Sequence, residues 1–148
     1  MRYQFYREVP TMQRYGQVIR LKPGVLEAYK KYHAAAWPEI LDMIRQCNIR
    51  KYSIYHKDGF LFAYFEYVGN NFAADMAKMA ADPKTQEWWA IMMPLQVPLP
   101  TRAEGEWWAT MEEVFHTDCG GSKKAEGRGT EPGTADGQQC SRRSVTGE

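Results

Sequence analysis

The stretch Tyr29-Lys-Lys-Tyr-His33-Ala-Ala-Ala-Trp37-Pro38-Glu39 decides how the rest of the sequence is interpreted. Its apolar and aromatic residues recur at spacings that suit one face of an α-helix. Tyr29 and His33 stand four residues apart, so a helix makes them neighbours on one face. A phenol beside an imidazole can donate, accept and exchange protons near neutral pH. Pro38 lacks a backbone N–H and disfavours helical geometry before it, so we expect the helix to bend or restart there.

Composition favours a single domain with an uncharged ligand. The 148 residues carry a net charge of +1, and aromatic residues make up 14% of them. This length supports one domain with a sizeable core. A balanced charge provides no strong field for nucleic acid or an anionic membrane, so we expect neither as a partner. Flat aromatic rings suit both protein cores and neutral polar ligands such as sugars.

The cysteines and the lack of long apolar runs indicate the cellular compartment. Cys47, Cys119 and Cys140 have neither the spacing of metal ligands nor that of a disulfide framework. No apolar run reaches the length of a membrane span, and the N-terminus lacks a signal-peptide core. We therefore expect a soluble, cytoplasmic protein with reduced thiols.

Hydrophobic periodicity predicts six elements in the order βαββαβ. Strands are expected at residues 15–21, 50–56, 60–67 and 107–116, and helical segments at 23–46 and 72–93. Asp58-Gly59 is a strong signal for a tight hairpin, and Asn71 is a suitable N-cap for the second helical segment. The order is that of an α+β, ferredoxin-like sandwich, in which the first and third strands are central.

The strand over residues 60–67 is apolar on both faces, so we expect both faces to be covered. Helices cover one face, and a second copy of the chain is the simplest cover for the other, which gives a homodimeric α/β barrel. The expected organisation is a lead-in over residues 1–14, an α+β domain over 15–117 and a disordered Gly- and Ser-rich tail over 118–148. The tail has too few large aliphatic residues to bury a core.

The chemistry available to this chain is limited. The three histidines lack metal-ligand spacing, and there is no glycine-rich phosphate loop and no serine elbow, so we expect no metal. What remains is His33, several tyrosines and the adjacent pair Trp88-Trp89. Adjacent helical residues point about 100° apart, so that helix is either buried on more than one side or edges a pocket. This set suits proton transfer on a neutral, ring-shaped polar molecule.

Three strings together resemble the L-rhamnose mutarotase family from about Tyr15 to His116. They are Tyr29-x3-His33-x3-Trp37-Pro38-Glu39, Lys51-Tyr52-Ser53-Ile54-Tyr55 and Trp88-Trp89. The resemblance implies a dimeric α/β-barrel enzyme, an isomerase that interconverts the α and β anomers of a sugar without a cofactor. L-rhamnose is the first candidate and L-fucose the second. The resemblance also implies a catalytic role for His33 as proton donor. It implies substrate binding by Tyr29, Tyr52, Trp88 and Trp89.

Other interpretations fit the same residues. The histidine and tyrosine could simply be satisfied at the edge of the core. A cofactor-free monooxygenase or a haem-degrading protein on the same barrel also uses a histidine, a tryptophan and an apolar pocket. A non-enzymatic sugar-binding module would use His33 only for hydrogen bonding. We expect Trp37 and Glu39 to be structural, and the sequence leaves open whether Tyr29 or a carboxylate partners His33.

Overall fold

The computed structural model describes residues 11–118. The chain divides into a compact unit that ends at His116 and a second unit from Thr117 onward, of which Thr117 and Asp118 are described. Most of the predicted lead-in and nearly all of the predicted tail therefore lie outside the described residues. Within the described range, no helix is long and apolar enough to cross a membrane.

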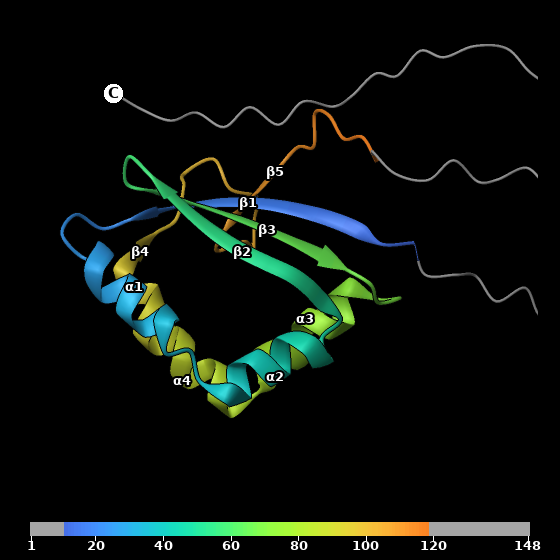
Figure 1. Ribbon diagram of the computed structural model, residues 1–148, viewed down its shortest axis with the longest axis horizontal. Coiled ribbons are helices and arrows are strands. Elements are labelled where there is room, and N and C mark those ends of the chain that lie inside the picture. The colour runs from blue at the N-terminus through green and yellow to red at the C-terminus, as the bar shows by residue number, and fades with distance from the viewer. Residues whose placement is uncertain (1–10, 119–148) are drawn as a thin grey trace, which may run out of the picture. The chain divides into compact units, whose positions relative to one another are not determined.

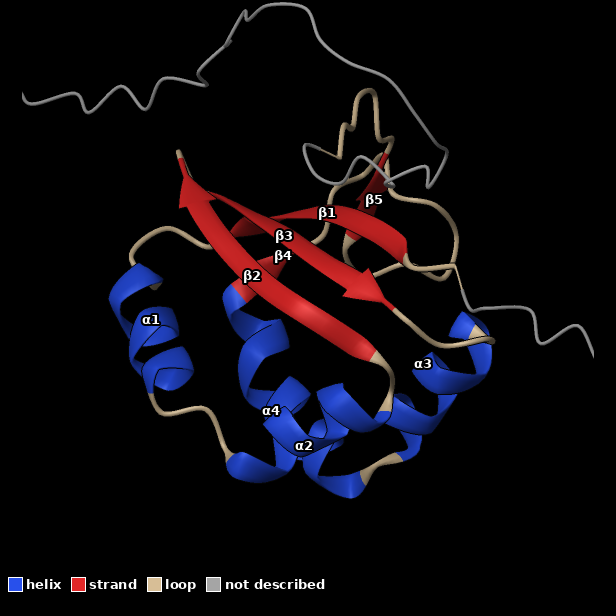
Figure 2. Cartoon of the chain, turned by 45° about the vertical axis from the view of Figure 1, so that its right-hand side comes forward, coloured by secondary structure: helices blue, strands red, loops and turns tan. Residues whose placement is uncertain are grey.

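The four α-helices of the described residues lie on one face of an antiparallel sheet (Figures 1 and 2). The elements in order are β1 (Gln13–Leu21), α1 (Leu26–Ala34), α2 (Pro38–Gln46), β2 (Ile49–Lys57), β3 (Phe60–Tyr67), α3 (Phe72–Ala81), α4 (Pro83–Met92), the 3-10 helix η1 (Met93–Leu95), β4 (Gln96–Val97) and β5 (Ala109–Met111). The sheet order is β2-β3-β1-β4, with β5 also paired to β1. The predicted α+β class is confirmed, and β1 and β3 are central as expected.

The predicted helix boundaries follow from local capping. Trp37 is extended, with ψ 138°, and Pro38 begins α2, so the chain leaves α1 and restarts rather than bending. The Asn71 side chain accepts a hydrogen bond of 3.0 Å from the Ala74 N–H and caps α3. Asp82 does the same for α4 through the Thr85 N–H at 2.8 Å.

The β2–β3 hairpin also forms as predicted. Asp58 and Gly59 have φ of 51° and 78°, and a tight hairpin turn of this kind needs positive φ at both central residues. β1 begins two residues earlier than predicted, because Gln13 and Arg14 continue the ladder opposite Tyr67 and Glu66.

The prediction of one long final strand is wrong. Two short strands share the outer edge of β1 instead: β4 pairs with Arg20 and Leu21, and β5 pairs with residues 16–18. The prolines between them cannot donate ladder hydrogen bonds, so the pairing is interrupted. Residues 112–118 form no strand.

The two faces of the sheet differ in burial. On β3, Leu61, Ala63, Phe65 and Tyr67 are buried against the helices, whereas the alternate residues are only half-buried. The buried face of β1 and β3 forms the core together with Tyr29, Ile40, Trp88 and Met92 from the helices. A site between sheet and helices therefore has a rigid floor, because every second residue of β3, together with Ile19 and Leu21 of β1, is packed there.

A β-bulge interrupts β2. Arg50 pairs with Glu66 and Ser53 pairs with Tyr64, so Lys51 and Tyr52 both oppose Phe65. Lys51 has φ 50°, a left-handed conformation that is uncommon for a residue with a side chain. The extra residue lets Lys51 bond Glu66 while the Tyr52 ring meets Phe65. The sequence pattern gave no indication of this bulge.

Candidate active site

A cavity of about 790 Å³ lies between the sheet and the helices, and it is lined by all five residues predicted to form the site. Tyr29 and His33 come from α1, Tyr52 from β2, and Trp88 and Trp89 from α4. Apolar side chains from the helices and the sheet make up much of the rest of the wall, among them Leu26, Ile40, Ile44, Ile54, Phe65 and Met92. Such a cavity suits a ligand with apolar faces and a few polar groups.

The His33 imidazole is oriented by its own helix. Its Nδ1 lies 2.9 Å from the Tyr29 carbonyl oxygen. Because a carbonyl can only accept, Nδ1 carries the hydrogen in this bond, and Nε2 remains available to a ligand. The imidazole also stacks on the Tyr29 ring, with centroids 4.2 Å apart, and meets Trp88 edge-on at 5.4 Å. Packing and one hydrogen bond therefore fix the direction of Nε2.

Tyr29 is the immediate partner of His33 in this structure. Among the described residues that line the cavity, Glu106 is the only carboxylate. It accepts hydrogen bonds from the Thr110 hydroxyl, at 2.6 Å, and from the Ala103 N–H. The hydrogen bonds from the Thr110 hydroxyl, the Thr110 N–H and the Ala103 N–H lower the pKa of Glu106. No carboxylate within residues 11–118 bonds to the imidazole.

The Tyr29 hydroxyl is buried and keeps its proton. The residue is only 4% exposed, and this burial raises the pKa of Tyr29 to about 12, with a hydrogen bond from Gln96 acting in the opposite direction. Its phenol therefore stays neutral at physiological pH and can donate a hydrogen bond.

Tyr52 approaches the cavity from the sheet. Its ring packs edge-on against Phe65, with centroids 5.6 Å apart, and it remains 41% exposed. Desolvation of the hydroxyl raises the pKa of Tyr52, and Tyr29 adds to the effect. Tyr52 is thus a second neutral hydroxyl that can reach a ligand from the opposite side to α1.

The tryptophans of α4 have different surroundings. Trp88 is 7% exposed and packs edge-on against Trp37, with centroids 5.4 Å apart. Trp89 is 36% exposed although it lines the same cavity. Trp37 packs against Trp88 and is the N-cap residue immediately before α2, which agrees with the structural role expected for it.

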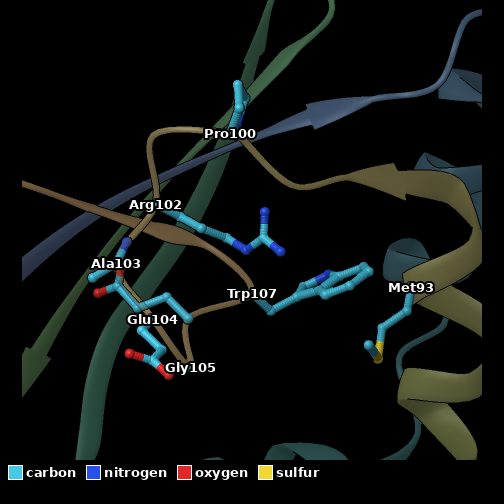
Figure 3. A pocket seen from close by; sticks show the side chains of 8 residues that line it. Met93, Pro100, Arg102, Ala103, Glu104, Gly105 and Trp107 are labelled. Atoms are coloured by element: carbon cyan, nitrogen blue, oxygen red, sulfur yellow. The ribbon is translucent and has the colours of Figure 1, made fainter.

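Sequence reasoning missed one wall of the cavity. Gln96 from β4 and Trp107 and Trp108 from the segment before β5 line it with Glu106. Trp107 also borders an open hollow of about 610 Å³, where its indole extends toward Met93 (Figure 3). The second pair of adjacent tryptophans was the available signal, but a proline-rich segment has no periodicity to say where its side chains point.

The fold and the cavity together define a class. The protein is an α+β protein with a curled antiparallel sheet, and its helices enclose an aromatic cavity lined by His33, which its own helix orients, and by His56 of β2. Within the described residues, no three His, Cys, Asp or Glu side chains are grouped as metal ligands would be.

Comparisons with known proteins give the family. The family model for L-rhamnose mutarotase matches residues 14–117, so the chain belongs to this family, whose reaction is an isomerisation. An L-rhamnose mutarotase from Sinorhizobium fredii is 34% identical over 108 residues, covering 71% of this chain and 98% of that protein. One from Phocaeicola vulgatus is 36% identical over 110 residues, covering 66% and 91%.

Solved structures agree on the fold. A crystal structure of an L-rhamnose mutarotase from Formosa agariphila superposes with a TM-score of 0.57 at 24% identity, covering 72% of this chain and 99% of that one. Tetracenomycin F2 cyclase from Streptomyces glaucescens, a type-II polyketide cyclase, gives a TM-score of 0.58 at 12% identity, covering 73% and 99%. The same fold thus carries different chemistries, so the site must decide the reaction.

Proposed function

We propose that this protein catalyses mutarotation of an aldopyranose, with L-rhamnose as the first candidate substrate and L-fucose as the second. The observation that carries the proposal is the His33 imidazole, whose Nδ1 is engaged by the Tyr29 carbonyl while Nε2 is free within an aromatic cavity. Membership of the L-rhamnose mutarotase family supports the choice of sugar.

The reaction needs two proton movements. The anomeric hydroxyl loses its proton while the bond from the anomeric carbon to the ring oxygen breaks, and the ring oxygen takes up a proton. The resulting open-chain aldehyde rotates and recloses on its other face. We assign both movements to His33 Nε2: it takes the proton of the anomeric hydroxyl as a base and, as part of the imidazolium, returns that proton to the ring oxygen. General acid–base help of this kind is typically worth about 10²- to 10⁴-fold.

The other predicted residues would bind the sugar. Trp88 and Trp89 offer aromatic faces for the apolar C–H face of a pyranose. Tyr29 and Tyr52 are neutral hydroxyls that approach from α1 and from the sheet, and each can bond a sugar hydroxyl or the ring oxygen. None of these roles requires a cofactor.

We also propose a homodimer, formed through the sheet face that the helices leave open. Its half-buried residues include Phe60, Phe62 and Tyr64, and Tyr55 is 65% exposed. Beyond β5, Val114 and Phe115 are 89% and 79% exposed, an unusual apolar surface for a monomer. Light scattering should give a dimer for the wild type and a monomer for Phe62→Lys, and a monomeric wild type would contradict the proposal.

A reducing, cytoplasmic setting is proposed as well. Cys47 is fully buried and unpaired, packed against Met43. A thiol buried in this way acts as a small hydrophobic residue rather than as part of a disulfide framework.

The decisive experiment measures anomer exchange directly. NMR saturation transfer between the α and β anomeric protons of L-rhamnose should show faster exchange with the wild-type protein. His33→Ala should remove roughly 10²- to 10⁴-fold of the acceleration, because the acid–base group is gone. L-fucose and D-glucose, tested in parallel, rank the sugars.

A matched variant and the alternatives complete the test. His116→Ala also removes an imidazole, but one outside the residues that line the cavity, and it should leave the rate unchanged. A binding module would lose affinity in His33→Ala without any wild-type acceleration. If the protein accelerates anomer exchange of none of the three sugars, the mutarotase proposal fails. Oxygen uptake with quinols or haem would then test the monooxygenase alternative.

A further inference from the structure

Three side chains from distant parts of the sequence form a hydrogen-bonded chain in the cavity wall. The Trp107 Nε1–H donates to Gln96 Oε1 at 2.8 Å, and Gln96 Nε2 donates to the Tyr29 hydroxyl at 3.4 Å. All three residues line the cavity that holds His33. Gln96 is only 6% exposed, and a buried amide is costly unless its polar atoms are bonded. The amide oxygen and nitrogen of Gln96 are bonded to these two neighbours.

The direction of this chain is fixed by chemistry. An indole N–H can only donate, so the Gln96 atom that faces Trp107 must be the amide oxygen. The amide nitrogen then faces Tyr29, and since it can only donate, the Tyr29 oxygen is the acceptor. The hydroxyl hydrogen of Tyr29 is therefore not used by Gln96 and is available to a ligand in the cavity.

The backbone holds the middle residue in place. Gln96 belongs to β4 and pairs with Leu21 of the central strand β1. The Lys22 N–H also donates to the Leu95 carbonyl at 2.9 Å. At 3.4 Å, the bond from Gln96 to Tyr29 is long, so it contributes little to the stability of the fold.

We infer that Gln96, itself oriented by Trp107, is a positioning residue that makes the Tyr29 hydroxyl an obligate donor to a sugar oxygen beside His33. The inference rests on the proposed mutarotase function. It adds a role for the cavity wall formed by Gln96 and Trp107, which lies outside the three sequence strings that resemble the family. The oxygen that Tyr29 would serve is one that gains negative charge as the pyranose ring opens, where a preoriented donor helps most. The raised pKa of Tyr29 supports this role, because the phenol keeps the hydrogen that it must donate.

The test is a double-mutant cycle measured by anomer exchange. Gln96→Met removes the donor to Tyr29 but keeps the side-chain volume, and Trp107→Phe removes the indole N–H but keeps a ring. Each should lower kcat roughly 3- to 10-fold, the range of one lost hydrogen bond, with a smaller change in KM. In a Tyr29→Phe background, where no hydroxyl is left to orient, both substitutions should have almost no further effect.

A neighbouring substitution provides the control. Trp108→Phe also removes an indole N–H from the cavity wall, but one outside this chain. Trp108→Phe should change kcat by the same factor in the wild-type background and in the Tyr29→Phe background.

The outcomes separate this inference from the proposed function. If Gln96→Met and Trp107→Phe lower kcat by the same factor in both backgrounds, Gln96 is only structural and the positioning role is wrong. Chemical unfolding of each variant checks that it is folded under the assay conditions, so that the kcat factors can be compared. A wild type that does not accelerate exchange overturns the mutarotase proposal itself, and the role of Gln96 in it.

Discussion

Two pairs of adjacent tryptophans line one cavity and do so in different ways. Trp88 and Trp89 lie on α4, where consecutive residues point about 100° apart, and one is 7% exposed and the other 36%. Trp107 and Trp108 lie in an irregular segment before β5, and both are half-buried. Helical geometry alone separates the first pair into a core residue and a cavity-edge residue. For the second pair, only a tertiary partner, Gln96, distinguishes the two indoles.

The largest expected effect lies within the helical pair. Trp88→Ala should lower the free energy of unfolding by about 3–5 kcal/mol, because it empties a packed core position. Trp89→Ala should cost less than about 1.5 kcal/mol, since its ring is already partly in water. Urea unfolding measures both values. Equal losses would mean that the helix does not divide its two tryptophans between core and cavity.

Tyr29 links the two walls, so its titration tests how well they exclude water together. Its pKa is raised from 10.0 to about 12 in the folded protein, so the unfolded chain releases this proton at lower pH. The contribution to stability is complete below pH 10 and is lost as the pH rises toward 12, by at most about 2.7 kcal/mol. Unfolding measured from pH 9 to 12 should show a steeper decline for the wild type than for Tyr29→Phe. If the stability of the wild type and of Tyr29→Phe declined in parallel with pH, water would have access to the Tyr29 hydroxyl in the cavity.

Substitutions of Lys51 test whether the irregular backbone at the β-bulge of β2 affects stability and substrate binding. The Lys51 φ of 50° is accessible to Asn but strained for a β-branched residue. Lys51→Val should destabilise the fold by about 1–2 kcal/mol and raise KM through a displaced Tyr52. Lys51→Asn should change both very little, because the Lys51 side chain is 73% exposed and Glu66 keeps its hydrogen bond from the Tyr64 hydroxyl. Thermal unfolding and anomer exchange measure the two effects. Equal stability and equal KM for Lys51→Val and Lys51→Asn would mean that residue 51 does not have the left-handed conformation.

The smallest expected difference lies within the irregular pair. Trp107→Phe leaves Gln96 Oε1 buried without its donor, whereas Trp108→Phe breaks no bond to Gln96. Both remove similar ring area, so their stabilities should differ by only about 1 kcal/mol, with Trp107→Phe the less stable. Careful urea titrations of the two variants can resolve this difference. The reverse order would show that the hydrogen-bonded chain does not hold this wall.

The sequence predicted the regular parts of the molecule well, for identifiable reasons. Caps and turns such as Asn71 and Asp58-Gly59 act locally, so their geometry could be predicted from the residues themselves. The spacing of Tyr29 and His33 likewise predicted their contact, because a helix makes residues four apart into neighbours.

The rest depended on contacts that no local pattern encodes. The last strand was predicted over residues 107–116, but β4 and β5 divide the edge of β1 between them. Gln96 has no motif around it, and its importance comes from residues 67 positions before it and 11 after it. The bulge at Lys51 was also invisible, since the alternation from Tyr52 onward looks regular by itself.

That bulge bears on how the chain tolerates changes in length. In an ordinary strand, losing one residue exchanges the two faces of everything beyond it. In β2, Ile49 and Tyr52 already lie on the helix side with one residue too many between them. A chain that lacked Lys51 would pair Tyr52 with Phe65 in plain alternation and keep the same residues toward the cavity. The strand can therefore gain or lose one residue at this point during evolution without turning its ligand-facing side chains outward.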